Sequence, residues 1–310
     1  MKKKISLVTP CYNEEENVNA IYSAVKNIMQ LKSQYDYEHI FIDNNSSDKT
    51  VQILKKIALE DKNVKLIVNA RNFGHIRSPY YGLLQSSGDA VILIVADLQD
   101  PPELIHQFIE KWEEGYKIVV GVKNQSKESF LMFAIRKTFY NLINKLSETK
   151  LIKNYTGFGL YDKKVIEILR TIDDPYPYFR GLICDIGFEI VKISYVQPQR
   201  YRGITKNNFY TLYDIAILGI TNHSKVPLRL ATMVGFVASL ISLLVALIYF
   251  LYKLLYWDSF VIGSAPMIIG VFLFSAVQLM FIGIIGEYVG SIHTQVLKRP
   301  LVIEKERINF

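Results

Sequence analysis

The chain has 310 residues, of which 50% are hydrophobic, so it can hold one large domain or two smaller ones. Its formal net charge is +7, but no basic–aromatic cluster or nucleic-acid motif accompanies that charge, which argues against a nucleic-acid partner. An anionic membrane surface or phosphate ligands explain the charge better. Cys11 and Cys184 fit no metal spacing and suggest no disulfide framework, so we expect a reduced, cytosol-facing domain.

The first half of the chain alternates short apolar strands with amphipathic helices. Strands are expected at residues 5–9, 39–42, 64–68, 91–95 and 117–122, and helices at about 15–34 and 49–59. Such alternation predicts an α/β fold with a mainly parallel sheet, right-handed crossovers and helices on both faces. Polar clusters follow the first, second and fourth strands, so we predict that the site lies on that edge of the sheet.

The central feature is residues 91–103, VILIVADLQDPPE, where a buried strand leads into Asp97, Gln99 and Asp100. Carboxylate and amide oxygens at the carboxyl end of a buried strand suit Mg²⁺ or Mn²⁺ beside a diphosphate. The structural alternative is that Asp100 caps the helix opened by the Pro-Pro pair, while Asp97 serves the turn. This stretch alone leaves both interpretations open.

The turns after the first two strands lack the GxGxxG motif of a dinucleotide-binding fold. Tyr12 offers a ring that can stack on a base, and Asp43 can hold a base or ribose edge. The alternative is that Asp43 and Asp48 are turn and helix-cap residues. We favour ligand binding for Asp43 and capping for Asp48.

Four motifs carry a resemblance to a known family: TPCYNEEENV, IDNNSSDKT, RNFG and ADLQDPPE. They resemble the family 2 inverting glycosyltransferases, which have the GT-A nucleotide-sugar fold. Within that family the chain is most similar to the polyprenyl-phosphate glycosyltransferases, the group of dolichol-phosphate mannose synthase and bactoprenol glucosyltransferase. The resemblance covers nearly the whole chain, including the ending GEYVGSIHTQVLKRPLV.

The resemblance implies a nucleotide-sugar site at the predicted edge. Asp97 and Gln99 would hold the sugar diphosphate and a divalent ion, Mg²⁺ or Mn²⁺, with Asp97 as the metal ligand. The residues implied to bind the nucleoside are Pro10, Tyr12, Glu14 and Asp43, and Arg71 is a further binding residue of the donor site.

Two departures from the family pattern bear on activity. Asn44 stands where a second acid is usual, and Val95 replaces the first acid of the usual Asp-x-Asp metal motif. A lone Asp97 can still anchor an ion that is held mainly by diphosphate oxygens and water. The departures leave open an alternative function, a catalytically inactive membrane scaffold that binds nucleotide sugars.

The acceptor side is predicted from basic residues. Arg200, Arg202 and Lys206 surround a glycine and suit phosphate oxygens, and the resemblance supports Arg200 and Lys206 in particular. The predicted catalytic residues are Asp97, Gln99, Arg200 and Lys206. Arg180 is a further candidate for the acceptor phosphate, with a surface salt bridge as its alternative. Anionic lipid head groups are the alternative ligand for the basic cluster.

Gly157 occupies the position where many relatives carry an acid, so we place no catalytic base there. A lipid-linked phosphate is already anionic at neutral pH and can attack the sugar without one.

Residues 230–252 and 259–286 contain no charge, which predicts two membrane-spanning helices in a hairpin. Basic residues flank its outer ends, so both termini and the catalytic domain are expected in the cytoplasm, as in a multi-pass protein of the cell membrane. The predicted organisation is a GT-A domain over 1–206, an amphipathic interfacial helix within 207–226, a hairpin over 227–290 with spans at about 230–252 and 260–286, and a tail over 291–310.

Together these features predict a membrane-bound enzyme that moves one sugar from a nucleotide sugar to a polyprenyl phosphate with inversion, for cell-envelope glycan modification. A UDP-sugar is favoured over a GDP-sugar, and the resemblance implies a homo-oligomer. Besides the scaffold, a processive polysaccharide synthase is an alternative, because residues 197–201 (QPQRY) faintly echo its QxxRW motif. Two spans are too few for a translocation pore, and Tyr201 departs from Trp.

Overall fold

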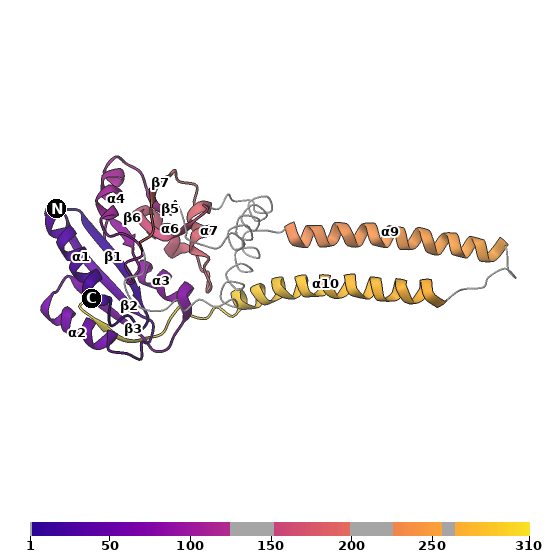
Figure 1. Ribbon diagram of the computed structural model, residues 1–310, viewed down its shortest axis with the longest axis horizontal. Coiled ribbons are helices and arrows are strands. Elements are labelled where there is room, and N and C mark those ends of the chain that lie inside the picture. Colours follow the sequence, from indigo (N-terminus) through magenta and orange to yellow (C-terminus); the bar gives the residue numbers. More distant parts are fainter. Residues whose placement is uncertain (1, 125–151, 199–225, 256–263) are drawn as a thin grey trace.

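In the described part of the chain, eight strands form one sheet in the order β7-β5-β6-β4-β1-β2-β3-β8. We use a computed structural model, which describes residues 2–124, 152–198, 226–255 and 264–310 (Figure 1). The strands are β1 (Lys4–Cys11), β2 (Asp36–Asp43), β3 (Val64–Asn69), β4 (Ala90–Leu93), β5 (Ile118–Lys123), β6 (Tyr155–Asp162), β7 (Ile190–Tyr195) and β8 (Glu304–Ile308). The helices are α1 (Val18–Leu31), α2 (Thr50–Glu60), α3 (Gly74–Leu84), α4 (Leu104–Glu113), α6 (Lys163–Thr171), α7 (Phe179–Asp185), α9 (Val226–Leu255) and α10 (Ser264–Val296).

The sheet is mainly parallel, as predicted. Strand β1 pairs in parallel with β2 and β4, β2 with β3, and β5 with β7, whereas β6 and β8 run antiparallel to their neighbours. The chain builds outward from β1 to β3 on one side and then returns to place β4 on the other side of β1. Open α/β sheets bind ligands at such a reversal, beyond the carboxyl ends of the strands.

Helices cover both faces of the sheet, because the strands are apolar on both sides. In β1, Leu7 packs into a core with α1, α2 and α4, while the next residue, Val8, packs into a second core with α3 and α6. Successive side chains of a strand point to opposite faces, so an unbroken apolar run fills both cores. The α/β class predicted from these runs is confirmed.

The residues that follow α10 belong to the sheet. The sequence predicts a separate tail over 291–310, but the structure pairs β8 with β3 (Figure 1). Val302 is buried, and the side-chain amide of Asn309 donates to the carbonyls of Ala58 and Val64, at 2.6 and 2.9 Å. The chain thus leaves the α/β domain, forms the helical hairpin and returns to the sheet.

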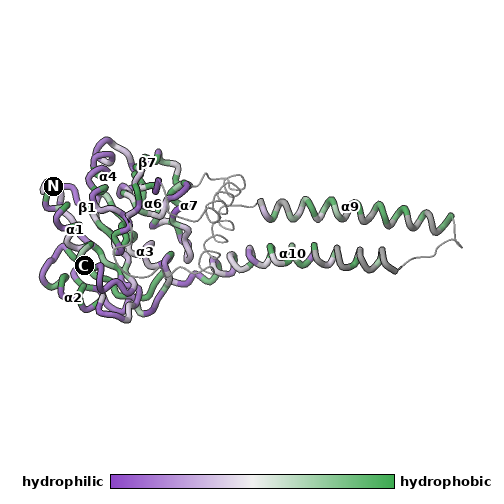
Figure 2. The backbone as a smooth tube through the Cα atoms, viewed as in Figure 1, coloured by the Kyte–Doolittle hydropathy of each residue, from purple (hydrophilic) through white to green (hydrophobic). Residues whose placement is uncertain are grey.

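Helices α9 and α10 contact each other and project together from the α/β domain (Figure 1). Figure 2 shows hydrophobic residues distributed along both helices. The hairpin arrangement is therefore as predicted. No helix in the described ranges, however, is both long enough and apolar enough to cross a membrane, so the two predicted crossings find no support in this structure. The interfacial helix predicted within 207–226 falls largely outside the described residues.

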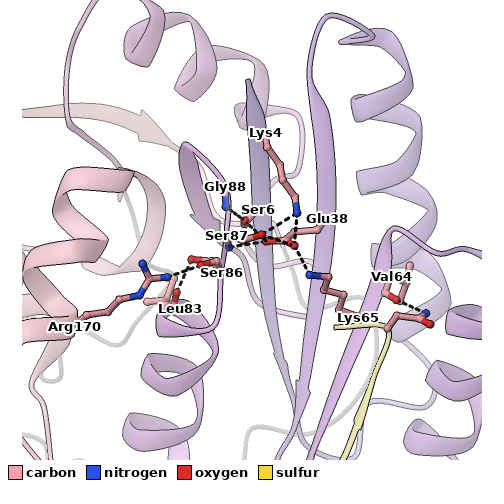
Figure 3. A network of polar contacts seen from close by, with 11 residues as sticks. Lys4, Ser6, Glu38, Val64, Lys65, Leu83, Ser86, Ser87, Gly88 and Arg170 are labelled. Atoms are coloured by element: carbon pink, nitrogen blue, oxygen red, sulfur yellow. Dashed lines mark hydrogen bonds and ion pairs between the residues drawn. The ribbon is translucent and has the colours of Figure 1, made fainter. Parts of the chain in front are cut away.

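An ion network ties three strands together near their amino ends, at the edge opposite the predicted site. The buried carboxylate of Glu38 in β2 accepts from Lys4 of β1 and pairs with Lys65 of β3, both at 2.7 Å (Figure 3). It also accepts from the Ser6 hydroxyl and the Ser87 backbone N–H. Burial alone would raise the pKa of Glu38, but these hydrogen bonds outweigh it and lower the pKa to about 2.

The Glu38 network predicts a pH-dependent part of the free energy of unfolding. Glu38→Gln should cost about 2 kcal/mol at pH 7, because two partly buried lysines lose their carboxylate. Since the folded pKa lies below the ordinary value of 4.5, the contribution should be complete above about pH 5 and lost as the pH falls toward 2. Urea denaturation midpoints at pH 7, 5 and 3 measure both effects.

The control is Glu306→Gln, which breaks the exposed pair between Lys55 and Glu306 and should change the midpoint little. Equal midpoints for the Glu38 variant and the unaltered chain at pH 7 would contradict the role of the network.

Candidate active site

The sheet brings three polar loops to one edge. Cys11 at the end of β1 pairs with Asp43 at the end of β2, and Val8 of β1 pairs with Leu93 at the end of β4. The Asn44 N–H donates to the Cys11 carbonyl at 2.9 Å, which holds the first two loops together as they leave the sheet. The predicted gathering of the loops after the first, second and fourth strands is therefore present.

The loops after β1 and β2 are joined by hydrogen bonds into one unit. The Asn13 N–H donates to the Ser46 hydroxyl, the Ser47 N–H donates to the Asn13 side-chain carbonyl, and the Glu14 N–H donates to the Thr50 hydroxyl, each at 2.8 Å. Tyr12, at the start of the first loop, is 38% exposed and offers its ring to a planar ligand. Of the other predicted nucleoside residues on this loop, Pro10 and Glu14 are partly buried.

Asp43 and Asp48 both make the local hydrogen bonds of turn residues. Asp43 is fully buried and accepts from the backbone N–H of Ser46 at 2.9 Å and from its hydroxyl; burial raises its pKa. Asp48 accepts from the N–H of Thr50, two residues on, at 3.0 Å and from that of Glu15 at 3.2 Å, as an Asx-turn residue does. The N-cap of α2 is Lys49, so Asp48 serves the turn and does not cap the helix, and ligand binding by Asp43 stays a prediction.

Asn44 is a buried connection between the second loop and the RNFG segment. Its side-chain N–H groups donate to the Asn72 side-chain carbonyl at 2.8 Å and to the Gly74 carbonyl at 3.1 Å. Its own carbonyl oxygen accepts from the Phe73 N–H at 2.8 Å and from the Asn69 amide at 3.2 Å. A carboxylate has no donor, so only an amide completes this set. The hydrogen bonds therefore explain why an asparagine, Asn44, stands where a second acid is expected.

Arg71, the predicted donor-site residue of the RNFG segment, lies at the surface. Its guanidinium donates to the Asn72 carbonyl at 3.1 Å and lies 4.0 Å from the centre of the Phe73 ring. Asn44 thus holds the segment by hydrogen bonds, while Arg71 is exposed.

The third loop carries Asp97 in a tight turn. Asp97 is 8% exposed, and its Oδ1 accepts from the Gln99 N–H at 3.2 Å. Leu98, between them, has φ +57°, a left-handed conformation that costs a branched side chain energy and needs support from its surroundings.

Asp100 does not cap the following helix, so the alternative prediction that this residue is a helix cap is wrong. Helix α4 begins at Leu104, and the buried Asp100 carboxylate accepts from the Tyr195 hydroxyl at 2.6 Å. Burial is the largest influence on Asp100 and raises its pKa to about 6, against the lowering effect of that hydrogen bond. Tyr195 is a residue of this region that the sequence did not indicate.

The side chains fit one divalent ion with few protein ligands. Within the described residues no group of three His, Cys, Asp or Glu side chains could hold a metal by itself. Asp97, with Gln99 beside it, supplies hard oxygen atoms, which suffices where diphosphate and water complete the coordination, as is usual for Mg²⁺. Val95 is partly buried and brings no oxygen from its side chain.

The acceptor side is described in part. Gly157 has φ +107°, and a Cβ there would lie 3.3 Å from Leu93 Cδ2, so an acid in its place would be strained. Arg180 donates to the Tyr155 carbonyl at 3.3 Å and lies over the Tyr178 ring. Arg200, Arg202 and Lys206 fall outside the described residues, so their predicted roles stay predictions.

Comparison with known proteins identifies the family. The profile described as Glycosyl transferase family 2 matches residues 6–169, which include all three loops. The chain belongs to glycosyl transferase family 2. It is therefore a glycosyltransferase, and the family predicted from the four motifs is confirmed.

Relatives within the family match nearly end to end. The chain is 35% identical over 304 residues to the SfII prophage-derived bactoprenol glucosyl transferase of Shigella flexneri, covering 98% of each chain. It is 34% identical over 308 residues to the prophage bactoprenol glucosyl transferase homolog of Escherichia coli K12, covering 97% of this chain and 98% of that one.

A solved structure shows the same fold. Glucosyl-3-phosphoglycerate synthase from Mycobacterium tuberculosis, crystallised with Mn²⁺, UDP and phosphoglyceric acid, superposes with a TM-score of 0.50 at 18% identity. The superposition covers 71% of this chain and 76% of that one. The GT-A fold expected of the family is therefore confirmed for the α/β domain.

The hydrogen bonds of Asn44 predict the effect of restoring the acid usual in the family. Asn44→Asp should lower the free energy of unfolding by about 1–3 kcal/mol, because the carboxylate faces two acceptors and donates to neither. Urea denaturation midpoints at pH 7 measure the effect.

Asn45→Asp is the matched control, because it adds the same charge one residue away at an exposed position with φ +64°, which Asp tolerates. An Asn44→Asp variant as stable as this control would contradict the anchoring role.

Proposed function

We propose that this glycosyltransferase moves one sugar from a nucleotide sugar, with a UDP-sugar as first candidate, to a polyprenyl phosphate with inversion. The observation that carries the proposal is the extent of similarity to bactoprenol glucosyl transferases. It covers 98% of both chains and thus continues past the family 2 domain, through the helical hairpin. A shared donor domain alone would not account for similarity in the hairpin.

The donor would bind across the three loops at the sheet edge. The Tyr12 ring would offer a stacking surface for the base, and Asp43, on the second of the two joined loops, would hold the base or ribose. Asp97 and Gln99 would face the diphosphate and hold the metal ion. When bound there, Mg²⁺ or Mn²⁺ supplies positive charge that stabilises the leaving nucleoside diphosphate.

The transfer itself is a single displacement. An oxygen of the lipid phosphate forms a bond to the anomeric carbon while the bond from that carbon to the diphosphate oxygen breaks on the opposite face. The attacking phosphate is already anionic, so no side chain has to remove a proton, which agrees with a backbone at Gly157 that disfavours an acid. Under this proposal the protein contributes orientation of the two substrates and charge stabilisation.

The helical hairpin is the proposed contact with lipid. Many large apolar side chains of α9 and α10 are exposed, and apolar surface of this extent marks an interaction site. Those on α9 include Met233, Phe236, Leu240, Ile241, Leu244 and Ile248, and those on α10 include Met267, Val271, Leu279, Met280 and Ile282. We place the hairpin in the cell membrane, with the catalytic domain and both termini on the cytoplasmic side.

Asp97→Asn should reduce sugar transfer by about 100-fold or more while the chain stays folded, because the substitution removes the charged ligand that faces the diphosphate. The assay follows label from a panel of UDP- and GDP-sugars into the organic phase, with undecaprenyl phosphate and Mg²⁺ or Mn²⁺. Asp36→Asn, at an exposed position on the opposite edge of the sheet, should transfer normally.

Full activity of the Asp97 variant would refute its assignment. Nucleotide-sugar binding without transfer by the unaltered chain would instead favour the inactive scaffold.

The proposed lipid contact predicts that the protein floats with liposomes in a density gradient and stays with them at alkaline pH in carbonate. Burial of the apolar side chains in lipid resists both treatments, whereas attachment by surface charge does not. Recovery of the protein in the aqueous fraction would refute the proposal. Cross-linking in the same liposomes tests the predicted homo-oligomer.

A further inference from the structure

The loop that carries Asp97 is closed by a residue from the far side of the sheet. The Asp100 carboxylate, at the end of the loop, accepts from the Tyr195 hydroxyl at 2.6 Å. Tyr195 is the last residue of β7, and two strands, β5 and β6, separate β7 from β4. One carboxylate thus ties the end of the loop to a distant strand.

The surroundings of the Tyr195 ring are built to let it reach Asp100. A Cβ at Gly121 of β5 would lie 3.1 Å from Tyr195 Cε1 and 2.7 Å from Phe158 Cδ1, so only glycine leaves room for both rings. The Tyr195 ring meets the Phe158 ring edge-on, with centroids 5.8 Å apart, and Phe158 packs in turn on Phe108 of α4. The hydroxyl is therefore held in place by packing as well as by its hydrogen bond.

The loop needs such support. Leu98 has φ +57°. The residue before it, Asp97, accepts from the N–H of the residue after it, Gln99. A strained backbone persists only where the surrounding structure fixes it. Without the tie to Tyr195, the loop would be free to relax at Leu98 and to move the Asp97 oxygens.

We infer that Tyr195 is a positioning residue, which acts through Asp100 to hold Asp97 in the geometry that binds a divalent cation together with a nucleoside diphosphate. The inference rests on the proposed function for the role of Asp97, and it adds a residue and a bond that the family motifs do not include. Mutation of the outer partners of metal ligands typically lowers metal affinity by about 10- to 100-fold.

The test measures UDP binding to the full chain in detergent by calorimetry, with and without Mn²⁺. Tyr195→Phe keeps the ring and removes the hydroxyl, so it should weaken Mn²⁺-dependent UDP binding by about 10-fold or more and leave metal-free UDP binding unchanged. Tyr22→Phe is the matched control: it removes a hydroxyl that donates to Asp61 at 2.9 Å, in contacts between α1 and the residue after α2. The control should bind UDP normally under both conditions.

A double-mutant cycle shows whether Tyr195 acts through Asp100. Asp100→Asn should also weaken Mn²⁺-dependent binding, and combining it with Tyr195→Phe should cost no more than the larger single effect. Additive losses, an unchanged Mn²⁺ dependence in Tyr195→Phe, or an equal loss with and without metal would each overturn the inference. If Tyr195→Phe does not fold, the UDP affinities of Asp100→Asn with and without Mn²⁺ provide the test.

The binding assay separates this inference from the proposed function. Failure of the unaltered chain to transfer sugar to lipid phosphate, with Mn²⁺-dependent UDP binding intact, would refute the proposed function and leave the Tyr195 inference to be judged by binding. Absence of Mn²⁺-dependent UDP binding in the unaltered chain would overturn the inference itself.

Discussion

The parallel pairing of β1 with β2 on one side and with β4 on the other is the constraint on which the site depends. Parallel strands end at the same edge, so the loops after all three must emerge together. The register fixes their relative heights, since Cys11 lies opposite Asp43 and Val8 opposite Leu93. The apolar runs that fill the cores on both faces hold that register, because a shift by one residue would exchange the two faces.

Polar groups at this edge are held mostly by one another. Asp43, Asn44 and Asp100 are buried, and each is satisfied by hydrogen bonds from a loop or from a distant strand. Burying such groups without partners would cost several kcal/mol, so the loops are stable only when the network is complete. The result is a sheet edge at which Tyr12 is exposed and Asp97 is 8% exposed, while the buried polar groups around them are held by hydrogen bonds. Preorganisation of this kind suits a reaction in which orientation and charge stabilisation provide the catalysis.

The order of strands and helices and the position of the site follow from local sequence patterns. Apolar runs and polar clusters are properties of adjacent residues, and they predict β1 to β5 and the loops between them. Long-range partners are not encoded in this way. Nothing near Asp100 in the sequence indicates Tyr195, which is 95 residues away. The role of Asn44 depends on which atoms face it across the RNFG segment. Gly157 stands where many relatives carry an acid, and its φ of +107°, which disfavours any side chain there, is visible only in the backbone.

Strand β8 is the clearest case of a feature hidden from sequence patterns. Its residues, EKERI, are charged except for the last, as is typical of edge strands that avoid pairing with other chains. It lies where the helical hairpin rejoins the α/β domain, and the Ala70 N–H, beside the RNFG segment, donates to the Ile303 carbonyl at 2.8 Å. Gln295 of α10 adds a second tie, a 2.8 Å bond to Asp174. Under the proposed function, a lipid phosphate delivered along the hairpin has to meet the anomeric carbon of a donor held at the sheet edge. The two ties join the hairpin to the α/β domain, and under the same proposal β8 would connect the lipid-facing part of the chain to the RNFG segment beside the donor site.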